Sequence, residues 1–493
     1  MERGKRREGV TRIGLYNVLF RISVAPLSFI FTFLVARYLS NPPYGTTYFA
    51  TWQTLYVFTV GYFTIPADLF SLITSRYSAE KKDVGGIVIV NLLSGALSGI
   101  IFALLVPYYV SLTKLDIPLY FYSAISLIVL TYLLKVTNAI AQGRTPKIVG
   151  ISAVVFQALR LIFGLFFMFV LNLSILAVIL AYDIGYIAQI LFNIFFIRAN
   201  LKLDFNIAKA AVRKSLVYIA NYLQYILEAS IVWIALGITN SDLVVAYFES
   251  AIIVSNIQIW TQASYTGLMA KLAEDKDPSL IPVSIKLYSI IGSLFLTLIY
   301  LDGYGLLFKL RPDYIQAIFA LYVLTFSNYL RGLYGIFYQA ITMADPTLSP
   351  NSQNEFKGYV FSLTRNNLVF SLVGLGASSL LIYLFSSYPS YIVAMLMTIG
   401  LLINSLVMLF TSFKLSSRIY KFSFPLKEFL IPLLLSFISL PISMRFKPIT
   451  FLQMIEYSII WIIVFSSFNV ILNPYGKQLF TLIIREFKQR YYK

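Results

Sequence analysis

Residues 84–112 read VGGIVIVNLLSGALSGIIFALLVPYYVSL and contain no charged side chain. A helix needs about 20 mostly apolar residues to cross the hydrocarbon core of a bilayer, so this run is long enough for one span. The strands of a membrane barrel alternate apolar and polar residues over about ten positions, whereas this run stays apolar throughout. The segment therefore predicts a transmembrane helix.

Similar runs recur along the whole chain, separated by short polar breaks. The 493 residues are 59% apolar and only 12% charged, with a mean hydropathy of +0.78, which does not fit a soluble protein. We expect an all-α integral membrane protein of about 14 transmembrane helices, surrounded by the lipid bilayer. The predicted spans are 13–37, 45–70, 84–112, 117–139, 147–171, 174–197, 214–238, 243–269, 282–301, 314–343, 360–385, 389–413, 426–443 and 449–472.

The distribution of positive charge predicts the orientation. Of the 39 Lys and Arg residues, 28 lie in loops on the side of both termini and six on the opposite side. Cytoplasmic loops of membrane proteins carry the excess of Lys and Arg, so we expect both termini in the cytoplasm and the protein in the cell membrane. This asymmetry accounts for the net charge of +18 without a nucleic acid partner.

The composition also excludes several kinds of chemistry. The chain has no Cys and no His, so it can form no disulfide, no zinc cluster and no Cys or His catalytic centre. No Gly-x-x-x-x-Gly-Lys-Ser/Thr run occurs that could form a P-loop. We therefore predict no cofactor, no metal site and no enzymatic activity.

A weak internal repeat divides the chain. Tyr48-Phe49-Ala50 at the start of the second span is echoed by Tyr247-Phe248-Glu249 at the start of the eighth. The offset of six spans is even, which predicts two lobes of the same orientation, as in transporters that open alternately to either side. The expected organisation is a basic cytoplasmic N-terminus (1–12), an N-lobe (13–198), a C-lobe (199–413), two further spans (414–472) and a cytoplasmic amphipathic tail (473–493).

Ten of the charged residues in the predicted spans are expected to lie within the membrane. Each is costly in the bilayer and is expected to face protein or a water-filled cavity. They are Arg21, Asp68, Lys135, Arg160, Asp183, Glu228, Glu249, Arg331, Arg365 and Glu456. Four of them, Asp68, Lys135, Arg365 and Glu456, lie near span ends, where their side chains can extend to the interface.

Polar stripes at helical spacing predict a central hydrophilic cavity between the two lobes. The stripes are Asn17, Arg21, Ser28 and Thr32; Asn221, Gln224 and Glu228; and Asn328, Arg331, Tyr338 and Thr342. Guanidinium groups suit phosphate or carboxylate ligands, so the predicted substrate-binding residues are Arg21, Asn17, Ser28, Arg160, Asn328 and Arg331. Candidates for binding a coupling H⁺ or Na⁺ are Glu228, Glu249 and Asp183. For each residue, a salt bridge that only fixes packing is an open alternative.

Four short motifs resemble a known family. Residues 36–45, ARYLSNPPYG, are similar to the ARYLGPEEYG signature of the polysaccharide biosynthesis proteins, the lipid-linked oligosaccharide flippases of the multidrug/oligosaccharidyl-lipid/polysaccharide (MOP) exporter superfamily. Residues 76–80 (RYSAE), 141–144 (AQGR) and 273–274 (AE) resemble its RYIAE, LQGLGR and LSE segments in the same order. The resemblance covers about 13–413, and Ser40-Asn41-Pro42-Pro43 departs from it.

The resemblance implies two six-helix lobes that alternately open to cytoplasm and exterior. It also implies that they carry a polyprenyl- or dolichyl-(di)phosphate-linked glycan across the membrane, with glycan assembly enzymes as candidate partners. An ion-coupled multidrug exporter of the same superfamily is the main alternative, and it should favour acidic side chains over Arg in the cavity. A membrane glycosyltransferase or ligase is a weaker one, because the predicted outer loops are very short. The abundant Tyr and Phe are explained by packing and by the membrane interface in preference to stacking against sugars.

Overall fold

The structure is a computed structural model that describes residues 9–40, 42–112, 115–197 and 201–491. Every element in these ranges is helical, which confirms the predicted all-α class. Several sequence features lie outside the described residues: the basic terminus through residue 8, Asn41 of the first motif, Lys114, Arg198 and Lys493.

The helices form two compact units. Unit 1 comprises Met1–Leu216, Met269–Lys276 and Pro346–Glu355, and unit 2 comprises Val217–Leu268, Asp277–Asp345 and Phe356–Lys493. Unit 1 holds α1 (Val10–Ser40), α2 (Thr46–Tyr56), α3 (Ile65–Ala79), α4 (Gly85–Leu112), α5 (Pro118–Ser123), α6 (Ile125–Arg144), α7 (Lys147–Leu165), α8 (Ile175–Ile197), α9 (Phe205–Ser215) and nearly all of α13 (Leu268–Asp275). A π-helical turn (Val57–Gly61) and a 3₁₀ turn (Tyr62–Thr64) join α2 to α3.

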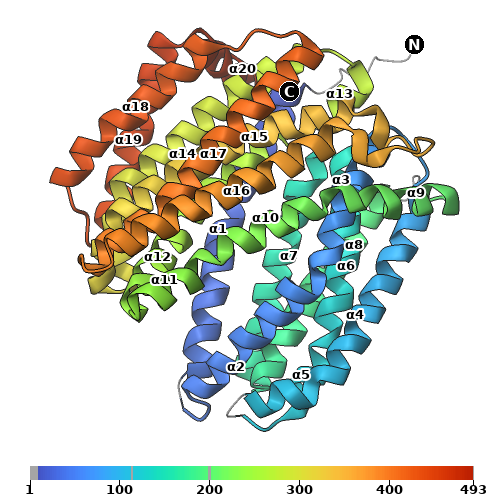
Figure 1. Ribbon diagram of the computed structural model, residues 1–493, viewed down its shortest axis with the longest axis vertical. Coiled ribbons are helices and arrows are strands. Elements are labelled where there is room, and N and C mark those ends of the chain that lie inside the picture. Colours follow the sequence, from blue (N-terminus) through green and yellow to red (C-terminus); the bar gives the residue numbers. More distant parts are fainter. Residues whose placement is uncertain (1–8, 41, 113–114, 198–200, 492–493) are drawn as a thin grey trace. The chain divides into compact units, whose positions relative to one another are not determined.

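Unit 2 holds the remaining helices. They are α10 (Ile219–Ala229), α11 (Ile231–Thr239), α12 (Asp242–Ser255), α14 (Leu280–Leu310), α15 (Ile318–Ala344), α16 (Tyr359–Leu384), α17 (Ser390–Tyr420), α18 (Leu426–Arg445), α19 (Phe451–Leu472) and α20 (Pro474–Tyr491). Helices α18 and α19, the predicted last two spans, pack against α14 of the same unit (Figure 1).

Each of the fourteen predicted spans coincides with a helix or a run of consecutive helices. Within the described residues, thirteen such segments are long and apolar enough to cross a membrane. The span predicted at 314–343 corresponds to α15, which is 27 residues long but is not among the thirteen. Helix α15 packs against α12, α14 and α17, so protein covers much of its surface and it can carry more polar side chains than a helix that faces lipid.

Two of the family-like motifs lie side by side in unit 1, where α3 packs along α6 (Figure 1). Ser78 Oγ donates a hydrogen bond to the Ile140 carbonyl at 2.8 Å. A Cβ on Gly143 would lie 2.3 Å from the Ser75 carbonyl oxygen, so only glycine allows this approach. The RYSAE and AQGR segments therefore form one helix–helix contact.

The end of the RYSAE segment is held by charge. Arg76 Nε lies 2.8 Å from Glu80, and Lys82 also contacts this carboxylate. Burial alone would raise the pKa of Glu80, but the two neighbouring cations outweigh burial and hold this pKa below its usual range. Tyr77, which is fully buried, donates to the carbonyl of Leu348 at 2.9 Å. The motif thus anchors the Pro346–Glu355 segment within unit 1.

The first motif has an equally local role. Tyr38 and Tyr44 pack edge to face, with ring centroids 5.1 Å apart, and both hydroxyls contact the side chain of Asn172 between α7 and α8. The backbone N–H of Ser174 donates to Tyr38 at 3.1 Å. The aromatic residues of this motif therefore fix the end of α1 against the α7–α8 turn.

Candidate functional site

Arg160 of α7 is the most enclosed charged residue in the predicted substrate-binding set. It is 3% exposed, and its guanidinium carbon lies 4.3 Å from the centroid of Phe31, 4.6 Å from Tyr182 and 4.9 Å from Phe156. Cations over aromatic faces are attracted by the ring quadrupole. The aromatic rings of α1, α7 and α8 therefore form a cage around one positive charge.

Close helix packing makes this cage possible. Gly164 lies one turn beyond Arg160, and a Cβ at Gly164 would lie 2.5 Å from the Phe31 ring. The glycine therefore lets Phe31 of α1 reach the surface of α7. The Phe156 and Tyr186 rings stack with centroids 5.1 Å apart and close the α8 side.

Arg160 lines a cavity of about 320 Å³ within unit 1. Its wall combines a cation, amides and hydroxyls with broad aromatic faces. The lining residues are Ser28, Phe31, Thr32, Val35, Trp52, Gln53, Tyr56, Phe156, Gln157, Arg160, Tyr182 and Tyr186. The structure thus brings two predicted residues, Ser28 and Arg160, into one cavity.

The charge of Arg160 is not neutralised by a carboxylate among the described residues. Its one hydrogen bond there is to Ser28 Oγ at 3.4 Å, and its Nε has no hydrogen-bond partner. A guanidinium keeps its charge when buried and presents a planar set of donors that matches phosphate or carboxylate oxygens. This cavity can hold an anionic group against Arg160 and flat or ring-shaped apolar groups against its aromatic wall.

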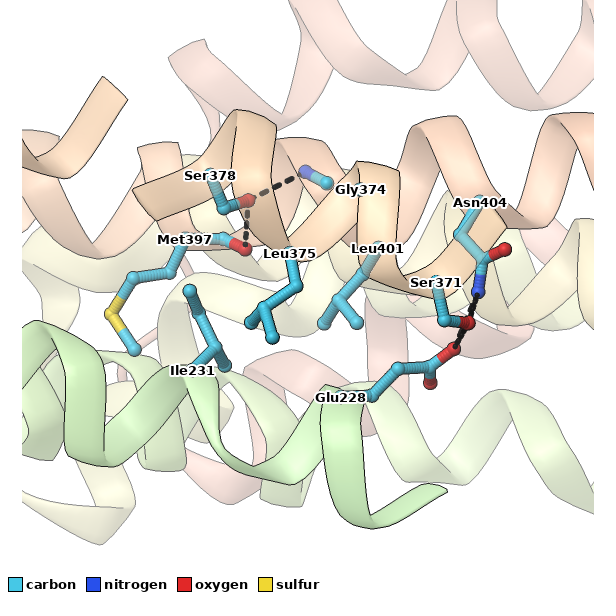
Figure 2. Close-up of a pocket in the computed structure, with 10 residues that line it drawn as sticks. Glu228, Ile231, Ser371, Gly374, Leu375, Ser378, Met397, Leu401 and Asn404 are labelled. Atoms are coloured by element: carbon cyan, nitrogen blue, oxygen red, sulfur yellow. Dashed lines mark hydrogen bonds between the residues drawn. The ribbon is translucent and has the colours of Figure 1, made fainter. Parts of the chain in front are cut away.

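A second polar cluster lies in unit 2 around Glu228 of α10. Arg331 Nη2 of α15 lies 2.8 Å from the Glu228 carboxylate, and Arg331 Nε donates to Ser405 at 2.9 Å. Figure 2 shows Ser371 and Asn404 directed at the same carboxylate, to which both donate hydrogen bonds. Helices α10, α15, α16 and α17 thus meet at one ion pair.

The pocket beside Glu228 is very small, with a volume of about 10 Å³, which is roughly the minimum for a single water molecule. Its walls are mostly apolar, and Figure 2 shows Leu375 and Leu401 pointing toward the helices that carry Glu228 and Ile231. The surroundings of Glu228 are therefore closely packed in this structure, and its ion pair with Arg331 matches the salt-bridge alternative drawn from the sequence. A coupling role for Glu228 stays a prediction.

The other predicted residues of span 1 are separated by the structure. Asn17 is buried, donates to the Pro146 carbonyl at 3.0 Å and accepts from the Gly150 N–H at 2.9 Å, so its amide joins α1 to α7. Arg21, one turn further along, is exposed. The polar stripe therefore changes environment along the helix, and Asn17 and Arg21 do not share a pocket.

Three further candidates also lie outside the Arg160 cavity. Asn328 donates to the Ser255 carbonyl at 3.2 Å and ties α15 to α12. Asp183 accepts from Ser126 Oγ at 2.7 Å between α8 and α6, and its Oδ1 is buried without a hydrogen-bond partner among the described residues. Glu249 of α12 is exposed. Within unit 2, Glu249 does not line the pocket beside Glu228.

Comparisons with solved structures identify the fold. A MATE in complex with MaD5 is 14% identical, with a TM-score of 0.63, over 84% of this chain and 98% of its own. An outward-facing multidrug resistance MATE family transporter of the MOP superfamily is 14% identical, with a TM-score of 0.59, over 85% and 98%. This chain has the fold of the MATE transporters.

A third similar structure is described by the polarity of its binding pocket. It is a MOP superfamily transporter from Pyrococcus furiosus, described as having a binding pocket of reverse polarity that suggests a different function, with 14% identity, a TM-score of 0.60 and coverage of 85% and 98%. No protein-family model and no curated protein sequence matches this chain. The likeness concerns the fold, and the thirteen long apolar helices of the described residues are those of a multi-pass membrane protein.

The aromatic wall on this MATE fold was not predicted from the sequence. Trp52, Tyr56, Phe156, Tyr182 and Tyr186 line the cavity, although the abundance of aromatic residues was explained by packing and the interface. One signal was present: Tyr182 and Tyr186 lie four residues apart on one face of α8. Within the described residues, no group of three or more acidic side chains could hold a metal ion.

Proposed function

We propose that this chain is a flippase that moves a polyprenyl- or dolichyl-(di)phosphate-linked oligosaccharide across the cell membrane by alternating access. The observation that carries the proposal is Arg160, a buried guanidinium without a carboxylate partner among the described residues, in a cavity walled by aromatic rings. A (di)phosphate would bind the guanidinium through charge-assisted hydrogen bonds. Sugar rings would pack against the aromatic faces.

The topology in this proposal follows the charge distribution. Both termini lie in the cytoplasm, and residues 13–198 and 199–413 act as the two lobes. The tail 473–493, of which Pro474–Tyr491 form α20, lies on the inner membrane surface. Glu228, Glu249 and Asp183 are the candidates for an H⁺ or Na⁺ coupling site. Glycan assembly enzymes would supply and consume the lipid-linked substrate.

A second candidate function is an ion-coupled multidrug exporter, which the similar MATE structures favour. The sign of the cavity charge separates the two candidates. A cationic drug would be repelled by Arg160 unless an acid neutralised it, whereas an anionic lipid headgroup would be attracted. Asp183 lies on the same helix as Tyr182 but does not line the cavity.

The test uses the purified chain in liposomes. A fluorescent polyprenyl-diphosphate-linked oligosaccharide is placed in both leaflets, and an impermeant quencher reports how fast the inner-leaflet molecules reach the outside. We expect the protein to accelerate this exchange and Arg160→Ala to abolish most of the acceleration. Arg418→Ala, which removes an exposed Arg in the last turn of α17, serves as the matched control and should act like the wild type.

Two outcomes would contradict the proposal. One is exchange of the lipid-linked oligosaccharide no faster than in empty liposomes, together with gradient-driven export of a cationic dye, which would establish the multidrug alternative. The other is an equal exchange rate for the wild type and Arg160→Ala, which would show that the Arg160 cavity does not take part in transport.

A further inference from the structure

A separate cavity of about 170 Å³ lies within unit 2, where α14 packs against α19. These two helices are side by side in Figure 1. The wall is apolar except for one carboxyl group, that of Asp302. None of its lining residues belongs to the Arg160 cavity or to the Glu228 cluster.

Asp302 is an unusual lining residue because only one of its two carboxylate oxygens accepts a hydrogen bond. It is 7% exposed, and its Oδ2 accepts a hydrogen bond from Ser458 Oγ of α19. Its Oδ1 is buried and has no hydrogen-bond partner, and no ion pair involves Asp302 among the described residues. A buried acceptor without a donor is costly, and a buried carboxylate without a cation more so.

The rest of the wall suits one small apolar group. Phe295, Leu298 and Ile257 face the cavity with Phe451 and Met454 of α19. Apolar cavities of about 150 Å³ hold molecules of the size of benzene. Two phenyl rings and a thioether give favourable contacts to an aromatic ring and, for the rings, to a cation.

We propose that this cavity binds a small lipophilic ammonium compound, with one aromatic ring among Phe295, Phe451 and Met454 and its ammonium group on Asp302 Oδ1. The ammonium supplies both the hydrogen bond that Oδ1 lacks and the opposite charge that the carboxylate lacks. A hydrocarbon chain of the bilayer would fill the same volume but would supply neither the hydrogen bond nor the opposite charge. The carboxyl group therefore selects an amine over a neutral molecule of the same shape.

The experiment titrates the purified full-length chain in detergent with 4-fluorobenzylamine and follows ligand binding by fluorine NMR. 4-Fluorotoluene, which has no charge, is the matched ligand. We expect saturable binding of the amine and at least tenfold weaker binding of the toluene. Asp302→Asn keeps the shape of the side chain and should lower the affinity for the amine at least tenfold. Asp313→Asn, which alters an exposed acid in the 3₁₀ turn that follows α14, should leave it unchanged.

A second variant keeps the test decisive if Asp302→Asn fails to fold. Met454→Trp leaves the carboxyl group in place and fills the cavity, so it should also abolish binding of the amine. Equal affinity of the wild type and Asp302→Asn for the amine overturns the proposal, as does undiminished binding by Met454→Trp. Equal affinity for amine and toluene would show an apolar cavity that takes hydrocarbon, and absence of binding to the wild type would show no site; both refute the proposal. None of these results depends on whether the chain transports a lipid-linked glycan.

Discussion

Arg331 of α15 and Glu228 of α10 form an ion pair of 2.8 Å at the point where four helices of unit 2 meet. The side chain of Glu228 is 10% exposed and that of Arg331 is 28% exposed, so the pair is largely shielded from solvent. Gln224, Ser371 and Asn404 also donate to the Glu228 carboxylate. This arrangement explains why a polar stripe can be kept in the interior of a membrane protein: its members satisfy one another.

The first prediction concerns the strength of this pair. Glu228→Gln should lower the free energy of unfolding by up to about 3 kcal/mol, because it leaves the partly shielded Arg331 charge without its counter-ion. The double variant Glu228→Gln with Arg331→Gln should lose less than the sum of the two single variants, since both charges are then absent. Thermal unfolding in detergent, followed by tryptophan fluorescence, measures these differences. Glu249→Gln removes an exposed acid and should change little.

The same variants separate packing from coupling. If Glu228 carries a coupling ion, a folded Glu228→Gln protein should transport without dependence on an ion gradient. A double variant that folds and keeps full gradient dependence would restrict Glu228 to a structural role. Strictly additive losses of stability would show that the two side chains do not act as a pair.

The second prediction concerns the contact between the RYSAE and AQGR segments. Gly143→Ala places a methyl group 2.3 Å from the Ser75 carbonyl oxygen and 2.7 Å from the Ala79 nitrogen, and backbone atoms cannot rotate away. We expect a loss of stability of about 1–3 kcal/mol, typical of overpacking. Gly237→Ala in α11 is the matched control: apart from its own helix, no described residue has an atom within 4 Å of the added Cβ, and alanine should stabilise that helix by up to about 1 kcal/mol. Equal unfolding temperatures for both variants would contradict the close approach of α3 and α6.

Hydropathy was enough to predict the spans, because the demand for about 20 apolar residues acts locally along the chain. It also predicted the span at 314–343 that corresponds to α15. Helix α15 is not among the thirteen segments of the described residues that are long and apolar enough to cross a membrane. The ion pair of Glu228 and Arg331 was foreseen as an alternative, since two charges in neighbouring membrane helices must be compensated. Both inferences use only the composition and the charges of the predicted spans.

The cage around Arg160 could not be predicted in this way. Phe31, Phe156 and Tyr182 come from three helices, and no spacing along the sequence specifies which rings will meet. Asn17 and Arg21 illustrate the same limit. They lie on nearly the same face of α1, one turn apart. Asn17 contacts the start of α7 and is buried, whereas Arg21 is exposed. Helical periodicity predicts which face of a helix a residue occupies, but it does not predict which neighbouring helix packs against that residue.

The third prediction concerns topology and uses a chain that has no native cysteine. Single cysteines in place of Ser279 or Gln353 should resist an impermeant thiol reagent in intact cells, because the charge distribution places these loops in the cytoplasm. Cysteines at Asn240 or Ser387 should react. All four positions are exposed. Ser78 is a poor reporter, because its buried hydroxyl is bonded to α6 and a cysteine there would be protected on either side. The opposite labelling pattern would reverse the orientation.

The fourth prediction tests Arg160 as a ligand for a diphosphate. The group would gain charge-assisted hydrogen bonds from a planar guanidinium in a partly desolvated cavity, a contribution of about 1.5–3 kcal/mol, or roughly 10- to 150-fold in affinity. Arg160→Ala should therefore weaken binding of a polyprenyl-diphosphate sugar by that factor. Arg160→Lys keeps the charge but loses the planar fork of donors, so its affinity should lie between those of the wild type and Arg160→Ala.

Variants of Arg21 and Arg331 test whether the diphosphate binds at Arg160 or elsewhere, because both residues were predicted alongside Arg160 as substrate-binding residues. Arg331→Ala would disrupt the ion pair with Glu228, so a loss of binding in that variant does not separate a contact with the ligand from a loss of structure. Arg21 is exposed, so Arg21→Ala should leave the fold intact and report on contact with the ligand alone. Binding is measured by microscale thermophoresis on folded protein in detergent. Wild-type affinity in Arg160→Ala, with reduced affinity in Arg21→Ala, would move the diphosphate site out of the aromatic cage to the exposed surface of α1.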